Sequence, residues 1–127
     1  MKTSPGPDHN AILCIEPRGE ICLLLSKMLE SKDIHVTHAA GMEEVLSDHY
    51  FEAPQPALII VENTFAEGEI AHNIAAIKER APASKVLMVS SVDGDIAKKA
   101  LIAGVDDFLT KPFTKSMLLD TVLAMVE

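Results

Sequence analysis

Four polar side chains stand directly after short apolar segments of this chain, at positions where they could act together chemically. They are, in order, Glu16, Glu62, Ser90 and Lys111. A group at the carboxyl end of a buried parallel strand lies where open α/β sheets place their binding and catalytic residues. If the four segments are strands of one sheet, two carboxylates, a hydroxyl and a lysine face one shallow pocket.

The segment Ala57–Val61 carries this interpretation best. It has five apolar residues without interruption and ends at Glu62. A short run that contains β-branched residues, with Pro54 and Pro56 just before it, is typical of a strand buried on both faces. Pro56 suits the first position of a strand, because its missing N–H matters least there.

Strands and helices are predicted to alternate five times along the chain. The other four strands are expected at residues 11–15, 34–39, 85–89 and 107–110. The helices are expected where apolar residues have helical spacing: Ile21, Leu24, Leu25 and Met28; Met42, Val45, Leu46 and Tyr50; Ile70, Ile74 and Ile77; Ala97, Ala100 and Leu101; and Leu119, Val122, Leu123 and Val126. Thr64, Asp93 and Thr114 are placed to cap the last three helices.

This alternation predicts a flavodoxin-like, three-layer α/β/α fold. Its five-stranded parallel sheet would have the order 2-1-3-4-5, with the first and third strands adjacent. Glu16 and Glu62 end those two strands and should therefore converge. Residues 1–10 are interpreted as a flexible leader and residues 11–127 as one domain.

Composition and charge exclude several classes of function. The net charge of −8 over 127 residues argues against direct binding to nucleic acid or to an anionic membrane surface. No apolar run is long enough to span a bilayer, and the first ten residues lack the apolar core of a signal peptide, which favours a cytoplasmic location. Cys14 and Cys22 are expected as reduced core residues.

Residue types that commonly catalyse reactions are not grouped in a known catalytic pattern. There is no Ser/His/Asp arrangement, no phosphate-binding glycine-rich loop and no CxxC. We therefore assign no catalytic residue and no set of metal ligands, and we do not predict an enzyme. The scattered histidines are expected at the surface: His9, His35, His38, His49 and His72. Four methionines are expected to fill the core: Met42, Met88, Met117 and Met125.

Three stretches of the chain carry a resemblance to a known family. Residues 103–113 read A-G-V-D-D-F-L-T-K-P-F, close to the A-G-A-D-D-Y/F-L-x-K-P-F segment of the receiver domains of two-component response regulators. Pro56–Val61 resembles the strand that carries the phosphoacceptor in that family, and Ile12–Glu16 resembles the strand ahead of its acidic pair. The resemblance covers residues 11–127.

The resemblance implies roles for several residues. In the family, an Asp after the third strand accepts a phosphoryl group from a histidine kinase, and two acidic residues after the first strand help it hold Mg²⁺. Lys111 matches the family lysine, and Ser90 matches the hydroxyl that contacts the phosphoryl group. Phe108 matches the aromatic residue whose rotamer reports activation. Pro112 matches a proline that follows a cis peptide bond.

Two departures from the family pattern affect the centre of the site. Glu16 fits the first acidic position, but the second is Pro17, which has no ligand atom. The phosphoacceptor position is Glu62, whose carboxylate is displaced by one methylene. A reacting group misplaced by about 1 Å can lose roughly 100-fold in rate. The loop at residues 63–69 also lacks the proline typical of the family.

These features together predict an atypical receiver, or pseudo-receiver, that binds Mg²⁺ weakly or not at all. It would need no cofactor and would act by contact with proteins, such as a histidine kinase or a downstream effector, with a possible homodimer through the fourth helix, fifth strand and fifth helix. Glu62 would either mimic the phosphoryl group or be an inert relic. The alternatives are an active receiver phosphorylated on Asp106 or Asp107, and a small flavodoxin-like enzyme or cofactor-binding protein.

Overall fold

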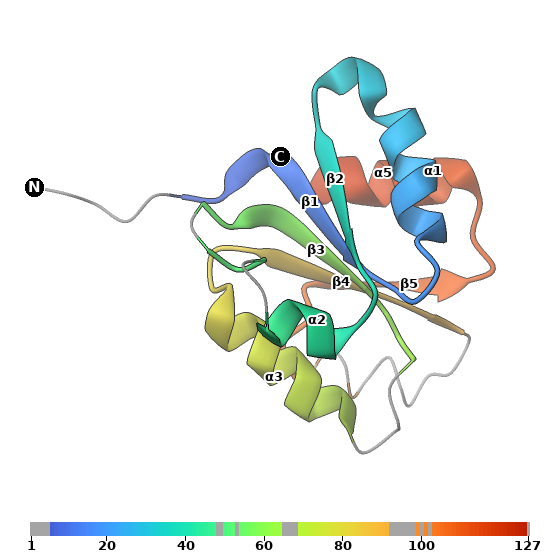
Figure 1. The fold of residues 1–127 in the computed structure, drawn as a ribbon. Coiled ribbons are helices and arrows are strands. Elements are labelled where there is room, and N and C mark those ends of the chain that lie inside the picture. The colour runs from blue at the N-terminus through green and yellow to red at the C-terminus, as the bar shows by residue number, and fades with distance from the viewer. Residues whose placement is uncertain are drawn as a thin grey trace, which may run out of the picture.

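The computed structural model describes residues 6–47, 50–52, 54–64, 69–91, 99, 101 and 103–126. Within these residues the chain alternates strands and helices (Figure 1). The elements, in order, are β1 (Asp8–Ile15), α1 (Glu20–Met28), the 3₁₀ helix η1 (Glu30–Lys32), β2 (His35–Ala39), α2 (Met42–Ser47), β3 (Pro56–Glu62), α3 (Ile70–Arg80), β4 (Lys85–Ser91), β5 (Asp107–Lys111) and α5 (Lys115–Val126).

The strands form one parallel sheet in the order β2-β1-β3-β4-β5. This is the predicted flavodoxin-like order, and it makes β1 and β3 neighbours. Ile15 pairs with Val61 in the register of these two strands, so Glu16 and Glu62 leave the sheet side by side. Glu62 pairs with Val89 and Ser91 with Lys111. All four strand-end groups therefore lie at one edge of the sheet.

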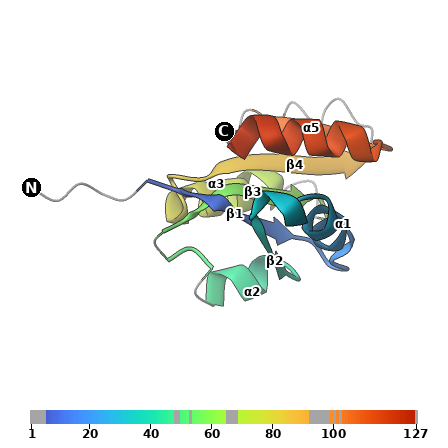
Figure 2. The same ribbon diagram turned by 90° about the horizontal axis from the view of Figure 1, so that it is seen from above.

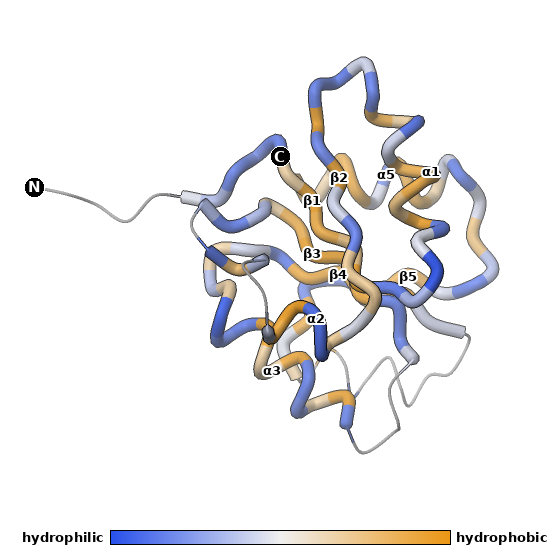
Figure 3. The backbone as a smooth tube through the Cα atoms, viewed as in Figure 1, coloured by the Kyte–Doolittle hydropathy of each residue, from blue (hydrophilic) through white to orange (hydrophobic). Residues whose placement is uncertain are grey.

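Helices cover both faces of the sheet, and each face has its own core. Figure 2 shows α5 on one side of the sheet and α2 on the other. Alternate residues of β1 divide between the two cores: Ile12 and Cys14 pack with α1 and α5, whereas Leu13 and Ile15 pack with α2 and α3. Six residues of β3, from Pro56 to Val61, are buried, as expected for a central parallel strand. In Figure 3 the central strands are accordingly orange.

The apolar faces of α1 and α3 are those expected from the sequence, whereas two others differ. The buried residues of α5 are Leu118, Val122, Met125 and Val126, and Leu119 and Leu123 are half-buried. The helix is thus rotated by about one position relative to the prediction. On α2, Val45 is buried but Leu46 is exposed. The prediction that Met117 fills the core was wrong, because its side chain is 48% exposed at the start of α5.

The first strand begins earlier than its apolar segment. Residues Asp8–Asn10, which we had placed in the leader, form the start of β1. The Asp8 N–H donates to the Gln55 carbonyl at 2.7 Å, and the Nδ1 atom of His9 lies 3.3 Å from the Val126 carbonyl oxygen. Backbone hydrogen bonds hold these polar residues in the strand, and the sequence contains no apolar pattern that would have predicted it. Most of the helix expected to begin at Asp93 lies outside the described residues.

Candidate functional site at the carboxyl edge of the sheet

The groups at the ends of β1 and β3 line a cavity of about 230 Å³. Glu16, Pro17 and Glu62 form its sheet side, and Glu69 and Asn73 contribute from the start of α3. Ala40 and Gly41, between β2 and α2, complete its wall. This is the switch point where the sheet order reverses, and ligands of doubly wound folds bind there.

Glu62 forms an ion pair with Lys111 across the sheet. The Oε2 atom of Glu62 accepts a hydrogen bond from Lys111 Nζ at 3.1 Å. The two side chains come from β3 and β5, so the contact spans the end of β4 between them. The Glu62 side chain is 22% exposed and that of Lys111 is 41% exposed, so solvent screens much of their attraction.

Ser90 does not share this ion pair. Its hydroxyl is buried at the end of β4 and accepts a hydrogen bond from Asn63 Nδ2 at 3.1 Å. The backbone N–H of Asn63 also donates to the Val89 carbonyl at 2.8 Å, which fixes the residue against β4. Our sequence analysis did not identify Asn63. Its position directly after Glu62, at the end of the strand, was the only available signal.

The carboxylate of Glu16 is directed into the start of α1. Its side chain is 2% exposed, with Oε1 accepting from the Ile21 N–H at 2.8 Å and Oε2 accepting from the Cys22 N–H at 2.7 Å. The first N–H groups of a helix have no partner within the helix, and its positive end favours an anion. Glu16 therefore serves as the cap of α1, and both of its carboxylate oxygens have backbone donors.

Gly19 and His38 hold the loop between β1 and α1. Gly19 has φ 73°, the left-handed conformation that glycine adopts at low cost, and the His38 ring lies 3.5 Å from the place a Cβ would occupy. The Nε2 atom of His38 lies 2.6 Å from the Glu16 carbonyl oxygen, and since a carbonyl only accepts, Nε2 is the donor. Our prediction of a surface position was therefore wrong for His38, which is half-buried and structural.

The remaining residues implied by the family resemblance have separate surroundings. Pro17 is exposed and lines the cavity, and the half-buried Phe108 packs against the core beneath α2 and α3. The Lys111–Pro112 peptide bond is cis. Thr114 caps α5 through a hydrogen bond from the Met117 N–H to its hydroxyl, at 3.1 Å.

The two spare carboxylates lie far from Lys111. Asp106 accepts hydrogen bonds from the Val86 N–H at 2.7 Å and from Lys78 Nζ at 2.8 Å, at the amino ends of β4 and β5. Asp107 is the first residue of β5 and Lys111 the last, so the strand separates them. These carboxylates therefore belong to the opposite edge of the sheet.

The described residues contain no group of three or more His, Cys, Asp or Glu side chains placed to hold a metal ion. Both cysteines are free thiols, with Cys14 buried in β1 and Cys22 half-buried in α1. Burial raises the pKa of each thiol above its usual range, by far the more for Cys14.

A profile of the response regulator receiver domain family matches residues 12–123. The chain therefore belongs to this family of two-component signalling domains, as its sequence motifs indicated. No curated protein sequence matched the chain significantly. No helix among the described residues has both the length and the apolar character needed to cross a membrane.

Solved structures share the fold at low sequence identity. A response regulator from Thermotoga maritima is 24% identical with a TM-score of 0.79, over 96% of this chain and 98% of the other. An orphan response regulator of H. pylori is 19% identical with a TM-score of 0.77, over 97% and 100%. A regulator from Burkholderia pseudomallei that carries a phosphorylated aspartic acid is 21% identical with a TM-score of 0.73, over 93% and 66%.

Proposed function

We propose that this chain is an atypical receiver that signals by contact with proteins and is not phosphorylated by the Mg²⁺-dependent route of its family. The observation that carries the proposal is the ion pair at the end of β3, where Glu62 replaces the expected aspartate and contacts Lys111 at 3.1 Å. The lysine that would receive a phosphoryl oxygen already has an anionic partner within the chain.

The surroundings of Glu16 support weak or absent Mg²⁺ binding. A carboxylate that ligates Mg²⁺ must present an oxygen to the ion. Both oxygens of Glu16 accept hydrogen bonds from α1 instead, and each hydrogen bond to a charged group is worth about 1.5–3 kcal/mol. Pro17 cannot replace this ligand, because its side chain has no donor atom. Recruiting Glu16 to a metal would therefore uncap α1.

The partner of Ser90 bears on what Glu62 does. An activating mimic of a phosphoryl group would draw the Ser90 hydroxyl toward the Glu62 carboxylate. The hydroxyl is instead bonded to Asn63, and Glu62 is bonded to Lys111. Two separate pairs favour a fixed ion pair at Glu62 over an activating mimic. A carboxylate also has one charge and two oxygens, fewer than a phosphoryl group supplies.

The test is incubation with Mg²⁺ and acetyl phosphate, followed by mass spectrometry of the intact protein and of its peptides. We expect no stoichiometric modification, and no saturable NMR shift around Glu62 when beryllofluoride replaces acetyl phosphate. The Burkholderia relative in the same assay controls for the phosphodonor. Modification that maps to Glu62 would overturn the proposal, and modification of Asp106 or Asp107 would establish the alternative receiver with a different phosphoacceptor.

We expect protein contact to involve β5 and α5 together with the fourth helix predicted from the sequence. Among the described residues of this face, Leu101 is 52% exposed and Met117 is 48% exposed. Family membership implies protein partners, and a homodimer through this face is the simplest form of such contact. Light scattering over a range of concentrations tests the dimer, with Leu101→Lys expected to favour the monomer. An unchanged mass at every concentration would exclude self-association.

A further inference from the structure

The ends of β3 and β4 carry a second polar pair beside the ion pair of Glu62. Glu62 is opposite Val89 in the register of the two strands. Asn63 extends this ladder, because its N–H donates to the Val89 carbonyl at 2.8 Å. In a parallel pair of strands the same register places Asn63 beside Ser90. The backbone of Asn63 is therefore held against β4, whatever its side chain contacts.

The side chain of Asn63 binds the Ser90 hydroxyl from this position. Asn63 Nδ2 donates to Ser90 Oγ at 3.1 Å, and Ser90 is only 5% exposed. A buried hydroxyl is costly to leave without a hydrogen-bond partner. Since the backbone of Asn63 is fixed and the hydroxyl is shielded from water, the amide of Asn63 sets the direction of the Ser90 side chain.

The two polar pairs at this edge of the sheet share no atom. Glu62 accepts a hydrogen bond from Lys111 Nζ at 3.1 Å. No hydrogen bond among the described residues joins Glu62 to Ser90, whose described partner is Asn63. A carboxylate can accept a hydrogen bond from a hydroxyl, and Glu62 directly precedes Asn63. Glu62 is therefore the acceptor available to Ser90 if the amide of Asn63 is removed.

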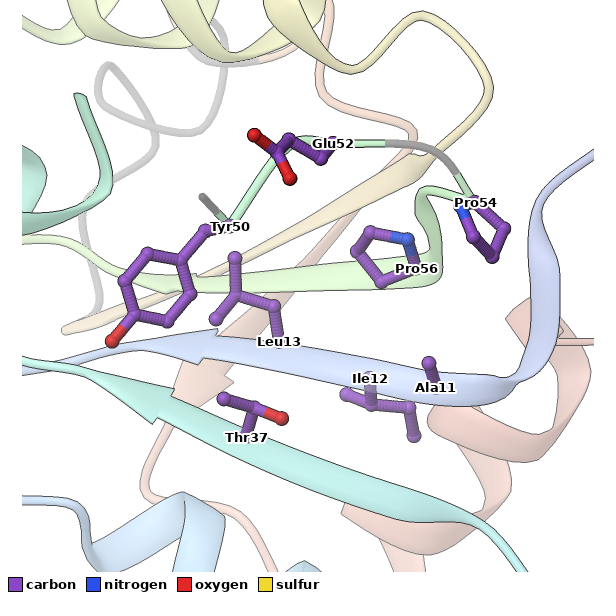
Figure 4. Close-up of a pocket in the computed structure, with 8 residues that line it drawn as sticks. All are labelled: Ala11, Ile12, Leu13, Thr37, Tyr50, Glu52, Pro54 and Pro56. Carbon is purple, nitrogen blue, oxygen red and sulfur yellow. The ribbon is translucent and has the colours of Figure 1, made fainter. Parts of the chain in front are cut away.

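Two cavities lie against the sheet, and neither is lined by Asn63 or Ser90. The first is the cavity beside Glu62. The second is a groove of about 360 Å³ over β1, and Figure 4 shows Tyr50 at one end of it and Pro54 at the other. A molecule bound in either cavity would not contact the Asn63–Ser90 hydrogen bond. The direction of the Ser90 side chain is therefore set by a contact within the chain.

We infer that Asn63 is a positioning residue, which holds the Ser90 hydroxyl away from Glu62 and so keeps Glu62 from acting as a mimic of a phosphoryl group. The inference rests on the proposed function, in which Glu62 forms a fixed ion pair. It makes Asn63 the residue that decides between the two roles considered for Glu62. Without the amide of Asn63, the Ser90 hydroxyl donates to the Glu62 carboxylate, and that carboxylate then links the ends of β3 and β4.

The side-chain NH₂ signals of Asn63 in ¹⁵N-labelled protein report the hydrogen bond to Ser90. Ser90→Ala should shift these signals and speed their exchange with water at least about threefold, because the acceptor is lost. Ser90→Thr keeps the hydroxyl and should preserve both properties. Ser91→Ala is the matched control, since Ser91 is the next residue on β4 and is exposed. The backbone signals of each variant report whether its fold is intact.

The positioning role is measured by the coupling between Ser90 and Glu62. In a double-mutant cycle of Ser90→Ala and Glu62→Met, followed by urea denaturation, the coupling factor in the unfolding equilibrium constant should be about 1 in the natural sequence. In the Asn63→Ala and Asn63→Leu backgrounds, which both lack the amide, it should rise to about threefold or more, because a hydroxyl–carboxylate hydrogen bond then forms. Thr64→Ala, at the next and exposed residue, is the control background and should leave the factor unchanged.

The inference fails if the Asn63 side-chain signals do not respond to Ser90→Ala, or if the coupling factor stays at about 1 in both Asn63 backgrounds. It also fails if the natural sequence already shows a threefold coupling, because Ser90 would then be bonded to Glu62 with Asn63 present. These outcomes are separate from the test of the proposed function. Modification of Glu62 by acetyl phosphate would overturn that function, whereas a failed cycle would leave it standing without a role for Asn63.

Discussion

Glu16 and Glu62 are the same residue type at the ends of adjacent strands, and they line the same cavity, yet they have different roles. Glu16 is 2% exposed and has two backbone N–H partners. Glu62 is partly exposed, and its hydrogen-bond partner among the described residues is the ammonium group of Lys111. Position at the end of a strand therefore brings a carboxylate to the cavity, whereas burial and available donors decide what the carboxylate does.

The energetic consequences of this difference follow from solvation. Removing a buried hydrogen-bonded carboxylate leaves two helix N–H groups without partners, at a cost of about 1–3 kcal/mol for each buried group left unpaired. When a partly exposed ion pair is broken, water replaces the lost contact, so such a pair stabilises the fold by only about 0–1 kcal/mol. The two carboxylates should therefore respond very differently to mutation, although the sequence presents them as equivalent.

The largest expected effect is at Glu16. Glu16→Ala should lower the free energy of unfolding by about 3 kcal/mol, because it uncaps α1 and leaves the Ile21 and Cys22 N–H groups unpaired. Urea denaturation measures the change. Glu20→Gln, on the exposed surface of the same helix turn, is the matched control and should cost less than about 0.5 kcal/mol. Equal effects at the two positions would contradict the assignment of Glu16 as the cap.

The loop that presents Glu16 to the helix should be next in sensitivity. Gly19→Ala forces a side chain into the left-handed region beside the His38 ring and should cost about 1 kcal/mol. Gly41→Ala is the control, since a Cβ there meets nothing within 4 Å, and its stability should be unchanged or slightly raised. Thermal unfolding measures both variants. If Gly19→Ala left the melting temperature unchanged, this loop would not be what holds Glu16 in place.

The ion pair at Glu62 should contribute less to stability. A double-mutant cycle with Glu62→Gln and Lys111→Met should give a coupling free energy of about 0.5 kcal/mol, and the coupling should shrink as salt is added. The same cycle on Asp106 and Lys78 provides a comparison, because that ion pair has a shorter N–O distance of 2.8 Å. A coupling free energy above about 2 kcal/mol would mean that Glu62, like Glu16, contributes strongly to the stability of the fold.

The smallest expected effect is that of Glu62→Asp on Mg²⁺ binding. If Glu62 holds the family's acceptor position, as we propose, this change restores the acceptor type. It leaves Pro17 without a ligand atom and Glu16 bonded to α1, so no binding is expected in a calorimetric titration. Adding Pro17→Asp supplies a second carboxylate and should make binding measurable. Tight binding by the single variant would show that Glu62 alone is the dominant defect.

Much of the fold was predictable because its signals are local. Uninterrupted apolar runs such as Ala57–Val61 and the helical spacing of Ile70, Ile74 and Ile77 identified elements that the structure confirms. The start of β1 was not predictable, because Asp8–Asn10 are polar and held by backbone pairing. The predicted buried face of α5 was wrong by about one residue. Five of the seven residues from Met117 to Leu123 are apolar, so the apolar surface is too broad to define one buried face.

The candidate site was predictable only at the level of which residues approach one another. Parallel strands end at the same edge, so the order of elements was enough to bring Glu16 and Glu62 to one cavity and Lys111 to Glu62. The prediction that Ser90 and Lys111 face the same pocket was wrong, because neither residue lines this cavity. The Asn63–Ser90 hydrogen bond and the contact of His38 with the Glu16 carbonyl had no sequence signature. Both depend on side chains from different elements, whose directions are set by packing.

The sequence by itself determined the family and the sheet order, and it predicted that Glu62 and Pro17 stand where the family has acidic residues. Periodicity and short motifs carry that information along the chain. Only the tertiary structure decided that Glu16 faces α1, that Ser90 is bonded to Asn63, and that Glu62 is paired with Lys111. A carboxylate takes the nearest donors that its burial allows, and which donors are nearest is fixed only when strands, loops and helices have packed.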